Sequence, residues 1–479
     1  MPRSVVLGVD SSTQSTKVVA IDRETAETVT EGRVSHTGED TQHPIDWWHA
    51  LVEATRAAVT PEMRVEAIAV GGQQHGLVTL DGSGGVIRPA PLWNNVDAAP
   101  DAERLNGAAN FADAVGSRLV ASFTIAKLAH LARTDPDDLA RTAAVALPHD
   151  WLNLKLTDNL VTDRGEASGS GWWSPAENRV RRDLLALAIG GAAAKRLRLP
   201  DVHGPLDVAG ALTPAAAAEL GLLAGIPVGP GTGDNMAAAL GIGAAPGEMA
   251  ISLGTSGTAF AVSDIATADP SGEVAGFADA TGRFMPLACM LNCTRVVDTV
   301  ATLVGLSRDD ALALAAETAP GADGLLLMPY LTGERTPNLP RTRGSLAGIS
   351  DDNAAPALLV RAALDGVAAG LAYCVDALVR LGIFAPAVTL VGGGSRHPVW
   401  QQAIADATGL RVIVRGGSEH AARGAAMQAL AIARGEPLDA VLARHRPQIV
   451  ATIEPRLEFR QAFRLDERRA IIAALMAGE

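Results

Sequence analysis

Two stretches of the chain, one at the N-terminus and one near the middle, repeat the same order of residue types. An apolar, β-branched run at residues 5–10 leads into the hydroxyl-rich segment 11–16, and residues 18–21 are apolar again. Residues 249–262 repeat this order around a Gly-Thr-Ser-Gly segment. Each stretch predicts a strand, a tight turn and a second strand. The repetition predicts duplicated domains that face one cleft.

The length of 479 residues exceeds what one hydrophobic core usually supports, which also favours two domains. Strands that alternate with helical patterns in each half predict an α/β fold. We therefore expect an N-terminal domain at residues 1–243 and a C-terminal domain at residues 244–479. The small-residue segment near this boundary is interpreted as the crossover between them.

Composition narrows the class of function. The net charge of −13 and the pI near 5.3 argue against nucleic acid or an anionic membrane as a partner. Three cysteines cannot form a disulfide framework, and no histidine lies near them to complete a zinc site. The N-terminus has no signal-peptide pattern, and no apolar run is long enough to span a membrane. These features predict a cytoplasmic protein that handles a small molecule.

Both hydroxyl-rich turns are candidates for holding phosphate, because a tight turn of small residues points several N–H and O–H donors at one place. Ordinary hairpin turns are the alternative for either turn alone. The P-loop and the dinucleotide-binding glycine motif are absent, so the paired turns would have to hold a nucleotide. The candidate contacts are Thr13, Gln14, Ser15 and Lys17 in the first turn, and Gly254, Thr255, Ser256, Gly257 and Thr258 in the second.

Asp234 is the candidate catalytic carboxylate. It follows two glycines and precedes residues 235–240, which can begin a helix. The alternative is a helix N-cap, which stabilises a protein by about 1 kcal/mol. Because the N–H groups at a helix N-terminus favour an anion, we expect this carboxylate to remain ionised. That state suits a base whose proton transfer comes late in phosphoryl transfer.

Polar residues after buried strands are candidates for ligand contacts, because ligands of open α/β sheets gather at the carboxyl ends of strands. Gln74 and His75 follow a buried strand between glycines, and their donors and acceptors suit the hydroxyl groups of a sugar. Trp93 and Asn94 are added because aromatic residues are only 4% of the chain. A surface histidine and core tryptophans are the alternatives.

A glycine-rich segment ends a later strand and is a candidate for the nucleotide side. Glycine there would let a base and ribose approach the backbone closely. A plain strand-to-helix turn is the alternative. The candidate contacts are Gly392, Gly393, Gly394 and Ser395.

With these residues assembled, the chain resembles the FGGY carbohydrate kinases over nearly its whole length, and most closely those members that act on D-xylulose. Each motif is weak alone, whereas ten in the family's order are specific. The matching elements are Val9-Asp-Ser-Ser-Thr-Gln-Ser-Thr-Lys17, Gly72-Gln-Gln-His-Gly76, Leu92-Trp-Asn94, Phe123-Thr-Ile-Ala-Lys127, Leu147-Pro-His-Asp-Trp151, Gly231-Thr-Gly-Asp-Asn235, Ser252-Leu-Gly-Thr-Ser-Gly-Thr258, Pro329-Tyr-Leu-Thr-Gly-Glu-Arg-Thr-Pro337, Arg343-Gly-Ser-Leu-Ala-Gly348 and Gly392-Gly-Gly-Ser395.

The resemblance implies two ribonuclease-H/actin-like domains with the active site in the cleft between them. It implies transfer of the γ-phosphoryl group of ATP to a sugar hydroxyl, which for D-xylulose is the C5 hydroxyl. Asp234 falls on the family's base, and Asp10 falls on the carboxylate that, with Asp234 beside it, organises Mg²⁺. Gln74, His75 and Asn235 fall on sugar contacts.

The chain departs from the family pattern where the choice of sugar is decided. Asn95-Val96-Asp97 replaces a carboxylate by an amide and a cation by an acid, and His130 and Leu358 are further departures. Ribulose, gluconate or a polyol therefore stay open as substrates. An actin-like ATPase and an inactive sugar-binding regulator are the alternatives from other classes. The oligomeric state is left open, a homodimer being one option.

Overall fold

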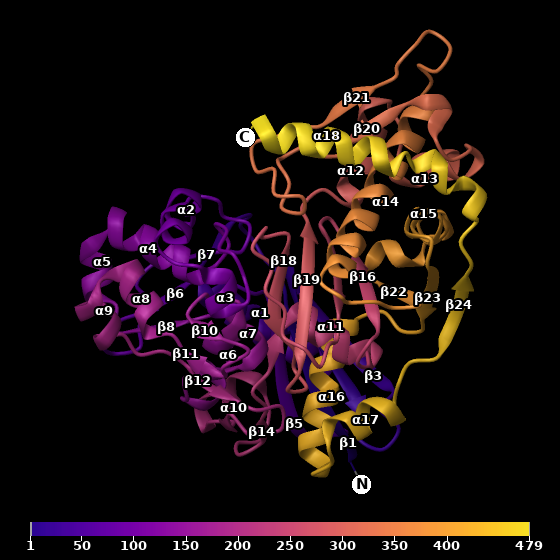
Figure 1. The fold of residues 1–479 in the computed structure, drawn as a ribbon. Helices are drawn as coiled ribbons and strands as arrows, with labels where there is room; N and C mark the ends of the chain where they lie inside the picture. The colour runs from indigo at the N-terminus through magenta and orange to yellow at the C-terminus, as the bar shows by residue number, and fades with distance from the viewer. Residues whose placement is uncertain (1, 479) are drawn as a thin grey trace.

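The computed structural model describes residues 2–478, which fold around two seven-stranded sheets (Figure 1). In spatial order the N-terminal sheet contains β13 (Gly210–Ala211), β14 (Pro227–Val228), β5 (Met63–Gly72), β1 (Arg3–Ser11), β2 (Ser15–Asp22) and β3 (Thr28–Ser35), with β15 (Thr232–Gly233) also paired to β5. The C-terminal sheet contains β18 (Val274–Ala278), β19 (Phe284–Met290), β17 (Gly257–Ala261), β16 (Met249–Leu253), β22 (Ala387–Val391), β23 (Arg411–Arg415) and β24 (Ile449–Ile453).

The two sheets share one pairing pattern. β1 pairs antiparallel with β2 and parallel with β5, and β16 pairs antiparallel with β17 and parallel with β22. The hairpins at residues 5–21 and 249–262 and the strand near residues 28–34 are therefore confirmed. The predicted duplicated α/β architecture is confirmed as well.

The outer helices cover one face of each sheet. Trp47 and Trp48 of α1 (Pro44–Ala58) and Trp151 of α6 (Pro148–Thr157) pack against the Val5, Leu7 and Val9 face of β1. On the C-terminal sheet this place is taken by α12 (Thr294–Leu303), α14 (Pro356–Arg380) and α15 (Pro398–Thr408). Both faces of each sheet are buried, as expected for sheets with parallel strands between helical layers.

The remaining described elements complete the two halves. The helices are α2 (Ala99–Ala108), α3 (Phe111–Val115), α4 (Thr124–Thr134), α5 (Pro136–Arg141), α7 (Arg164–Ser168), α8 (Arg182–Ile189), α9 (Gly191–Arg196), α10 (Pro214–Leu220), α11 (Asp234–Ile242), α13 (Arg308–Glu317), α16 (His420–Arg434), α17 (Leu438–Arg444) and α18 (Leu465–Gly478). The short strands are β4 (Thr41–Gln42), β6 (Val78–Leu80), β7 (Ala90–Pro91), β8 (Ala144–Ala146), β9 (Val161–Asp163), β10 (Trp173–Ser174), β11 (Arg179–Val180), β12 (Asp201–His203), β20 (Leu326–Met328) and β21 (Ser345–Ala347).

Helix α14 is the one described helix long and apolar enough to cross a membrane. Its 25 residues include a window that is 83% buried inside the protein. Its side chains belong to the core of the C-terminal half. Packing in this core therefore explains the length and apolar composition of α14.

Helices α11 and α16 form a layer between the two sheets (Figure 1). α16 belongs to the C-terminal half in sequence, but it packs on β1 and β5. Glycines allow this approach, since a Cβ atom at Gly8 would collide with the Ala422 carbonyl and one at Gly424 with the Ala237 carbonyl. The domain boundary at residue 244, which stays a prediction, is therefore crossed in space by a later helix.

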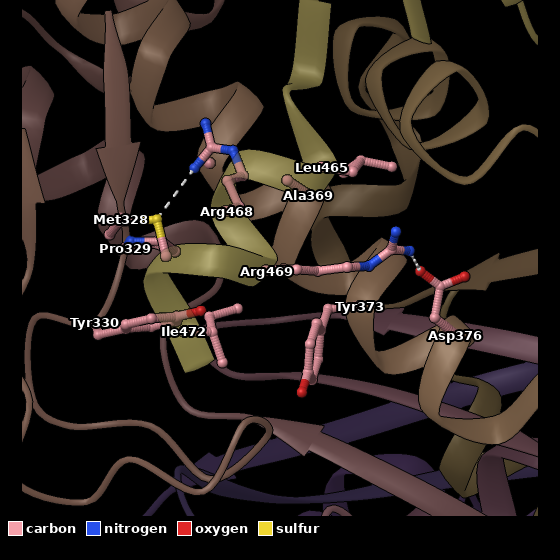
Figure 2. Close-up of a pocket in the computed structure, with 12 residues that line it drawn as sticks. Met328, Pro329, Tyr330, Ala369, Tyr373, Asp376, Leu465, Arg468, Arg469 and Ile472 are labelled. Atoms are coloured by element: carbon pink, nitrogen blue, oxygen red, sulfur yellow. Dashed lines mark hydrogen bonds and ion pairs between the residues drawn. The ribbon is translucent and has the colours of Figure 1, made fainter. Parts of the chain in front are cut away.

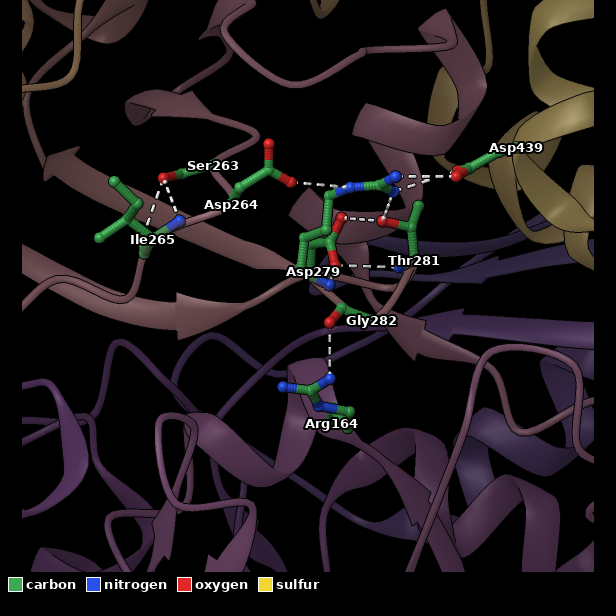
Figure 3. A network of polar contacts seen from close by, with 9 residues as sticks. Arg164, Ser263, Asp264, Ile265, Asp279, Thr281, Gly282 and Asp439 are labelled. Atoms are coloured by element: carbon green, nitrogen blue, oxygen red, sulfur yellow. Dashed lines mark hydrogen bonds and ion pairs between the residues drawn. The ribbon is translucent and has the colours of Figure 1, made fainter.

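The β18–β19 hairpin joins the C-terminal sheet to the N-terminal half. The N–H of Gly276 donates to the Gly116 carbonyl (3.0 Å), and the N–H of Ala278 donates to Ser168 Oγ (3.1 Å). At the hairpin turn, Arg164 of α7 donates to the Gly282 carbonyl (2.7 Å), as Figure 3 shows. The next residue, Arg283, forms an ion pair with Asp439 of α17 at 2.9 Å. The hairpin is therefore bonded to both halves.

We predict that Gly424→Ala lowers the melting temperature, because the added methyl group would have to displace the backbone of α11. Overpacking of this kind typically costs about 1–3 kcal/mol. Gly107→Ala on α2 is the control, since nothing lies within 4 Å of the added methyl group there. Thermal unfolding of both variants measures the effect, and an equal melting temperature for the two would contradict the packing described here.

Candidate active site

Three parallel strands end at one edge of the N-terminal sheet and carry the candidate residues. In the register of β1 and β5, Asp10 lies opposite Gly71, and in that of β15 and β5, Gly233 lies opposite Gly72. Asp10 is the last but one residue of β1, Gln74 follows β5, and Asp234 follows β15. The parallel pairing thus gathers residues that are far apart in the sequence.

Asp234 is the first residue of α11 rather than its N-cap. Gly233 occupies the cap position, and Asp234 Oδ1 instead accepts from the N–H (2.8 Å) and the side-chain amide (2.9 Å) of Asn235. Burial, and then the negative charge of Asp10, raise the pKa of Asp234 to about 7. The expectation that helix N–H groups keep this carboxylate fully ionised near neutral pH was wrong, because desolvation outweighs them. A carboxyl group that titrates near neutral pH is suited to accept a proton.

Asp10 is buried and interacts with the turn that follows it. Ser12 Oγ donates to Asp10, and Lys17 Nζ lies 3.5 Å from Asp10 Oδ2 and 2.7 Å from Glu419 Oε2. Burial raises the pKa of Asp10, whereas Lys17 and Ser12 oppose that rise. Glu419 directly precedes α16, so the later half of the chain contributes a charge to this turn.

His75 presents a neutral imidazole. Its Nδ1 lies 2.7 Å from the Gly169 carbonyl, an acceptor, so Nδ1 carries the proton. Burial, followed by the charges of Arg335 and Lys127, lowers the pKa of His75 well below its usual range. Nε2 is therefore an acceptor, as a sugar hydroxyl requires. Its backbone φ of 67° is in the left-handed region, which is uncommon for a non-glycine residue and is one of the forms of backbone strain found at active sites.

Gln74 lies beside the base-bearing segment. The position that a Cβ atom of Gly233 would take is 2.8 Å from Gln74 Cγ and 2.7 Å from Glu166 Oε1. Gln74 Nε2 and both carboxyl oxygens of Glu166 are buried with no hydrogen-bond partner in the described protein. Glu166 is fully buried, and burial followed by the charges of Asp150, Asp163 and Asp234 raises its pKa well above the usual range.

Trp93 and Asn94 follow β7, and only Trp93 of the two contacts the first turn. Trp93 Nε1 donates to Thr13 Oγ1 at 2.8 Å, and Thr13 Oγ1 donates to Gln73 at 3.1 Å, so Trp93 is connected to the first turn. Asn94 is exposed and its amide donates to the Glu39 carbonyl (2.9 Å), so no contact brings it to His75 or Asp234. Both stay predictions as sugar contacts.

Asn95, the first departure from the family pattern after Asn94, forms hydrogen bonds to neighbouring side chains. The amide of Asn95 donates to the carboxylates of Asp40 (3.0 Å) and Asp97 (3.1 Å). An aspartate at residue 95 would add a third carboxylate to this cluster. The other departures are also structural: His130 lies 3.4 Å from Asp101, and Leu358 packs on the C-terminal core.

The turns of the C-terminal half lie side by side. β16 and β22 are parallel and end together, and a Cβ atom at Gly392 would be 2.6 Å from the Leu253 carbonyl oxygen. The Gly254 carbonyl accepts from the N–H (3.1 Å) and hydroxyl (2.7 Å) of Thr294. The candidate nucleotide segments 254–258 and 392–395 are thus brought together.

One hydrogen bond joins these turns to the base. Thr258 Oγ1 donates to Asn235 Oδ1 at 3.0 Å. Asn235 is also the residue whose N–H and amide bind Asp234. The second turn and the candidate base therefore form one continuous hydrogen-bonded unit.

Sequence reasoning missed the residues that hold the base-bearing segment. The Pro230 carbonyl accepts from His149 Nε2 (2.8 Å) and Asn153 Nδ2 (2.7 Å), and the Gly231 N–H donates to Gln428 Oε1 (2.9 Å). Thr232 Oγ1 donates to Asp163 at 2.8 Å. The motif Leu147-Pro-His-Asp-Trp151 marked His149, but Gln428 sits on a distant helix without any local signal.

The donor set at the strand ends fits Mg²⁺. This ion prefers oxygen ligands and usually takes one or two carboxylates together with substrate phosphates and water. Asp10 and Asp234 are close enough for the charge of one to raise the pKa of the other. Within residues 2–478, no group of three or more His, Cys, Asp or Glu side chains could hold a metal ion. The protein would therefore supply two carboxylates and leave the remaining positions to phosphate and water.

A separate small cavity lies in the C-terminal half, between α14, α18 and the segment after β20 (Figure 2). Its volume is about 20 Å³, which holds about one water molecule. Arg469 at its rim is paired with Asp376, and none of the candidate residues lines it. It is not part of the candidate active site.

Comparison with known proteins identifies the class. Residues 5–241 match the N-terminal domain of the FGGY family of carbohydrate kinases, and residues 249–433 match its C-terminal domain. The chain therefore belongs to this family and is a sugar kinase, which takes its phosphoryl group from ATP. The family assignment confirms the resemblance seen in the sequence and the two-domain actin-like fold.

Individual relatives narrow the class further. The chain is 45% identical over 450 residues to a xylulose kinase from Streptomyces rubiginosus, covering 92% of this chain and 90% of the relative. A solved xylulose kinase from Bifidobacterium adolescentis is 36% identical with a TM-score of 0.84, covering 97% and 99% of the two chains. A solved "xyloylose kinase" from Brucella ovis is 32% identical with a TM-score of 0.90, covering 99% and 100%.

We predict that Gln428→Ala lowers kcat about tenfold and leaves the KM for ATP within about twofold, because the loop before Asp234 loses its link to α16. A displacement of about 1 Å can cost a hundredfold in rate. Steady-state kinetics measures both constants. Gln402→Ala on α15, which removes bonds to Asp406 and to the carbonyl of Glu454 after β24, is the control. An unchanged kcat for Gln428→Ala would contradict the positioning role.

Proposed function

We propose that this kinase transfers the γ-phosphoryl group of ATP to the C5 hydroxyl of D-xylulose and forms D-xylulose 5-phosphate. The observation that carries the proposal of a kinase site is the bond between Thr258 and Asn235, which joins a phosphate-type turn to the candidate base. The choice of D-xylulose is supported by relatives named xylulose kinase, at up to 45% identity over most of the chain.

In the proposed mechanism Asp234 accepts the proton of the sugar hydroxyl as the oxygen attacks the γ-phosphorus. The bond between that phosphorus and the bridging oxygen of ADP breaks, and the proton stays on the Asp234 carboxyl until it is released to solvent. In a loose transition state the attacking oxygen has formed little bond to phosphorus and keeps its proton until late. A carboxylate is therefore a sufficient base. Gln74, His75 and Asn235 would orient the sugar.

The nucleotide would lie along the C-terminal turns. The segments 254–258 and 392–395 would offer backbone N–H groups and hydroxyls to the nucleotide, and Thr13, Gln14, Ser15 and Lys17 of the first turn would bind its phosphates from the N-terminal half. Bound near Asp10 and Asp234, Mg²⁺ would neutralise charge on the phosphates. Water is excluded when the halves close, which prevents hydrolysis of ATP.

A panel of sugars tests the proposed substrate. We expect the highest kcat/KM for D-xylulose when phosphorylation of D-xylulose, ribulose, gluconate, xylitol and glycerol is measured by ADP release. The reason is that the side-chain amide of Asn95 donates to Asp40 and Asp97 and not to the candidate sugar-binding residues. A higher kcat/KM for another sugar would contradict D-xylulose as the substrate. ADP release without formation of a phosphosugar would contradict sugar phosphorylation.

Asp234 should control the pH dependence of the rate. Because its pKa is raised to about 7, the free enzyme is protonated below that pH, and kcat/KM for the sugar should fall about tenfold per pH unit as the pH drops below 7. Asp234→Asn should lower kcat by a factor of about 10²–10⁴ and remove this acid limb.

Stopped assays from pH 5 to 9 measure the limb, and calorimetric titration of ATP provides the folding control for Asp234→Asn. A variant that binds ATP and keeps the wild-type kcat would exclude Asp234 as the base. A wild-type profile flat from pH 5 to 9 would exclude its titration near 7.

A further inference from the structure

Arg335 lies in a loop that is fixed in place. It follows Glu334, which is buried and whose Oε1 accepts from the N–H groups of Leu291 (2.6 Å) and Arg335 (2.8 Å). The side chain of Asn292 donates to Glu334 Oε2 (3.0 Å) and to the Gly333 carbonyl (2.6 Å). The loop is therefore bonded to the residues that directly follow β19, and Arg335 has a defined position.

The end of β19 is next to the junction of sugar and phosphate sites. The Arg335 guanidinium is close enough to Cys289 to oppose the rise that burial causes in the pKa of its thiol. Cys289 pairs with Thr258 across β19 and β17. Thr258 is the residue that hydrogen-bonds Asn235, beside the base. Arg335 thus reaches the candidate site from the C-terminal half.

The same part of the C-terminal half also contacts the sugar-binding histidine. Thr336 Oγ1 donates to the Glu273 carbonyl (2.8 Å), and Glu273 directly precedes β18. Phe277 on β18 packs with its ring centroid 5.6 Å from that of His75. The loop that carries Arg335 is therefore attached to the strand that covers His75.

The charge of Arg335 is not neutralised by the protein. Its side chain is half-buried and forms no ion pair within the described part of the chain. The charged groups that act most on His75 are Arg335 and Lys127, and Lys127 is itself buried with Nζ on the carbonyls of His75 and Ser122. Asp234 acts on the same Cys289 thiol as Arg335 does, so the candidate base lies in the same region as the guanidinium. A half-buried guanidinium without a counter-ion is suited to bind oxygen atoms of a ligand.

We propose that Arg335 is a substrate-binding residue that donates hydrogen bonds to the sugar beside His75 and selects a ketose over the corresponding polyol. This inference rests on the proposed function. His75 Nε2 can only accept and Arg335 can only donate. An α-hydroxyketone matches this pair, because its hydroxyl donates to the imidazole while its carbonyl oxygen, which can only accept, takes the guanidinium. A polyol has a hydroxyl there, which can still accept from Arg335 but must direct its own proton to another acceptor, so it fits this pair less well.

Steady-state kinetics of Arg335→Gln and Arg335→Lys test the proposal. We expect Arg335→Gln to raise the KM for D-xylulose about 10- to 100-fold, the usual effect of losing a hydrogen bond to a charged group, while the KM for ATP stays within about twofold. Arg335→Lys keeps the charge but not the planar fork and should recover part of the loss. The preference for D-xylulose over xylitol or D-arabitol should fall in Arg335→Gln.

Arg308→Gln, on the exposed surface of α13, is the matched control for loss of one positive charge. An unchanged KM for the sugar in Arg335→Gln overturns the proposal, and so does a fall in kcat alone, which would place Arg335 on the transferred phosphoryl group. If Arg335→Gln does not fold, Arg335→Lys decides by the same two constants. If the wild-type enzyme prefers another sugar, the proposed substrate fails, and Arg335 is tested on that sugar.

Discussion

The candidate site depends on the parallel pairing of β1 and β15 with β5. Because all three strands end at one edge, Asp10 and Asp234 must lie close together at the end of a buried sheet. Burial and mutual repulsion then raise the pKa of Asp234 to about 7. Two carboxylates held so close are unfavourable in a purely structural role. The arrangement is reasonable where a proton or a cation arrives during function, as it does in phosphoryl transfer.

Helix α16 extends this constraint to the other half of the chain. It begins after Glu419, which pairs with Lys17 beside Asp10, and it carries Gln428, which binds the segment before Asp234. Its backbone packs closely on β1 at Gly8 and on α11 at Gly424. Both candidate carboxylates are therefore positioned by a helix from the C-terminal half. Removing that half would leave the N-terminal sheet without one face and the base without part of its support.

Local patterns in the sequence predicted the parts of the fold that local forces determine. Strand–turn–strand order predicted both hairpins, which the structure contains, and polar residues at strand ends marked Gln74, His75 and Asp234 as candidates. Gln428 was missed, because it acts across a contact between segments far apart in the chain and no local periodicity points to it. Arg335 lies inside the motif Pro329–Pro337, but its place near His75 is set by the tertiary structure. The ionisation state of Asp234 was mispredicted for a similar reason. A helix N-terminus is visible in sequence, whereas the burial and the neighbouring Asp10 that outweigh it are set by the tertiary structure.

The bonds of the β18–β19 hairpin to the N-terminal half determine which part of the candidate site is already formed before substrates bind. Its bonds to Gly116 and Ser168 and the bond between Arg164 and Gly282 hold β18 to the N-terminal half. A relative rotation of the halves that keeps these bonds must pivot at this edge, where Phe277 meets His75. The turn at residues 392–395 follows a strand further along the sheet order, and so it would move more in such a rotation, whereas Thr258 is held to Asn235. The sugar end would then stay formed while the nucleotide end opens and closes, which keeps the base and the sugar contacts in register through each cycle.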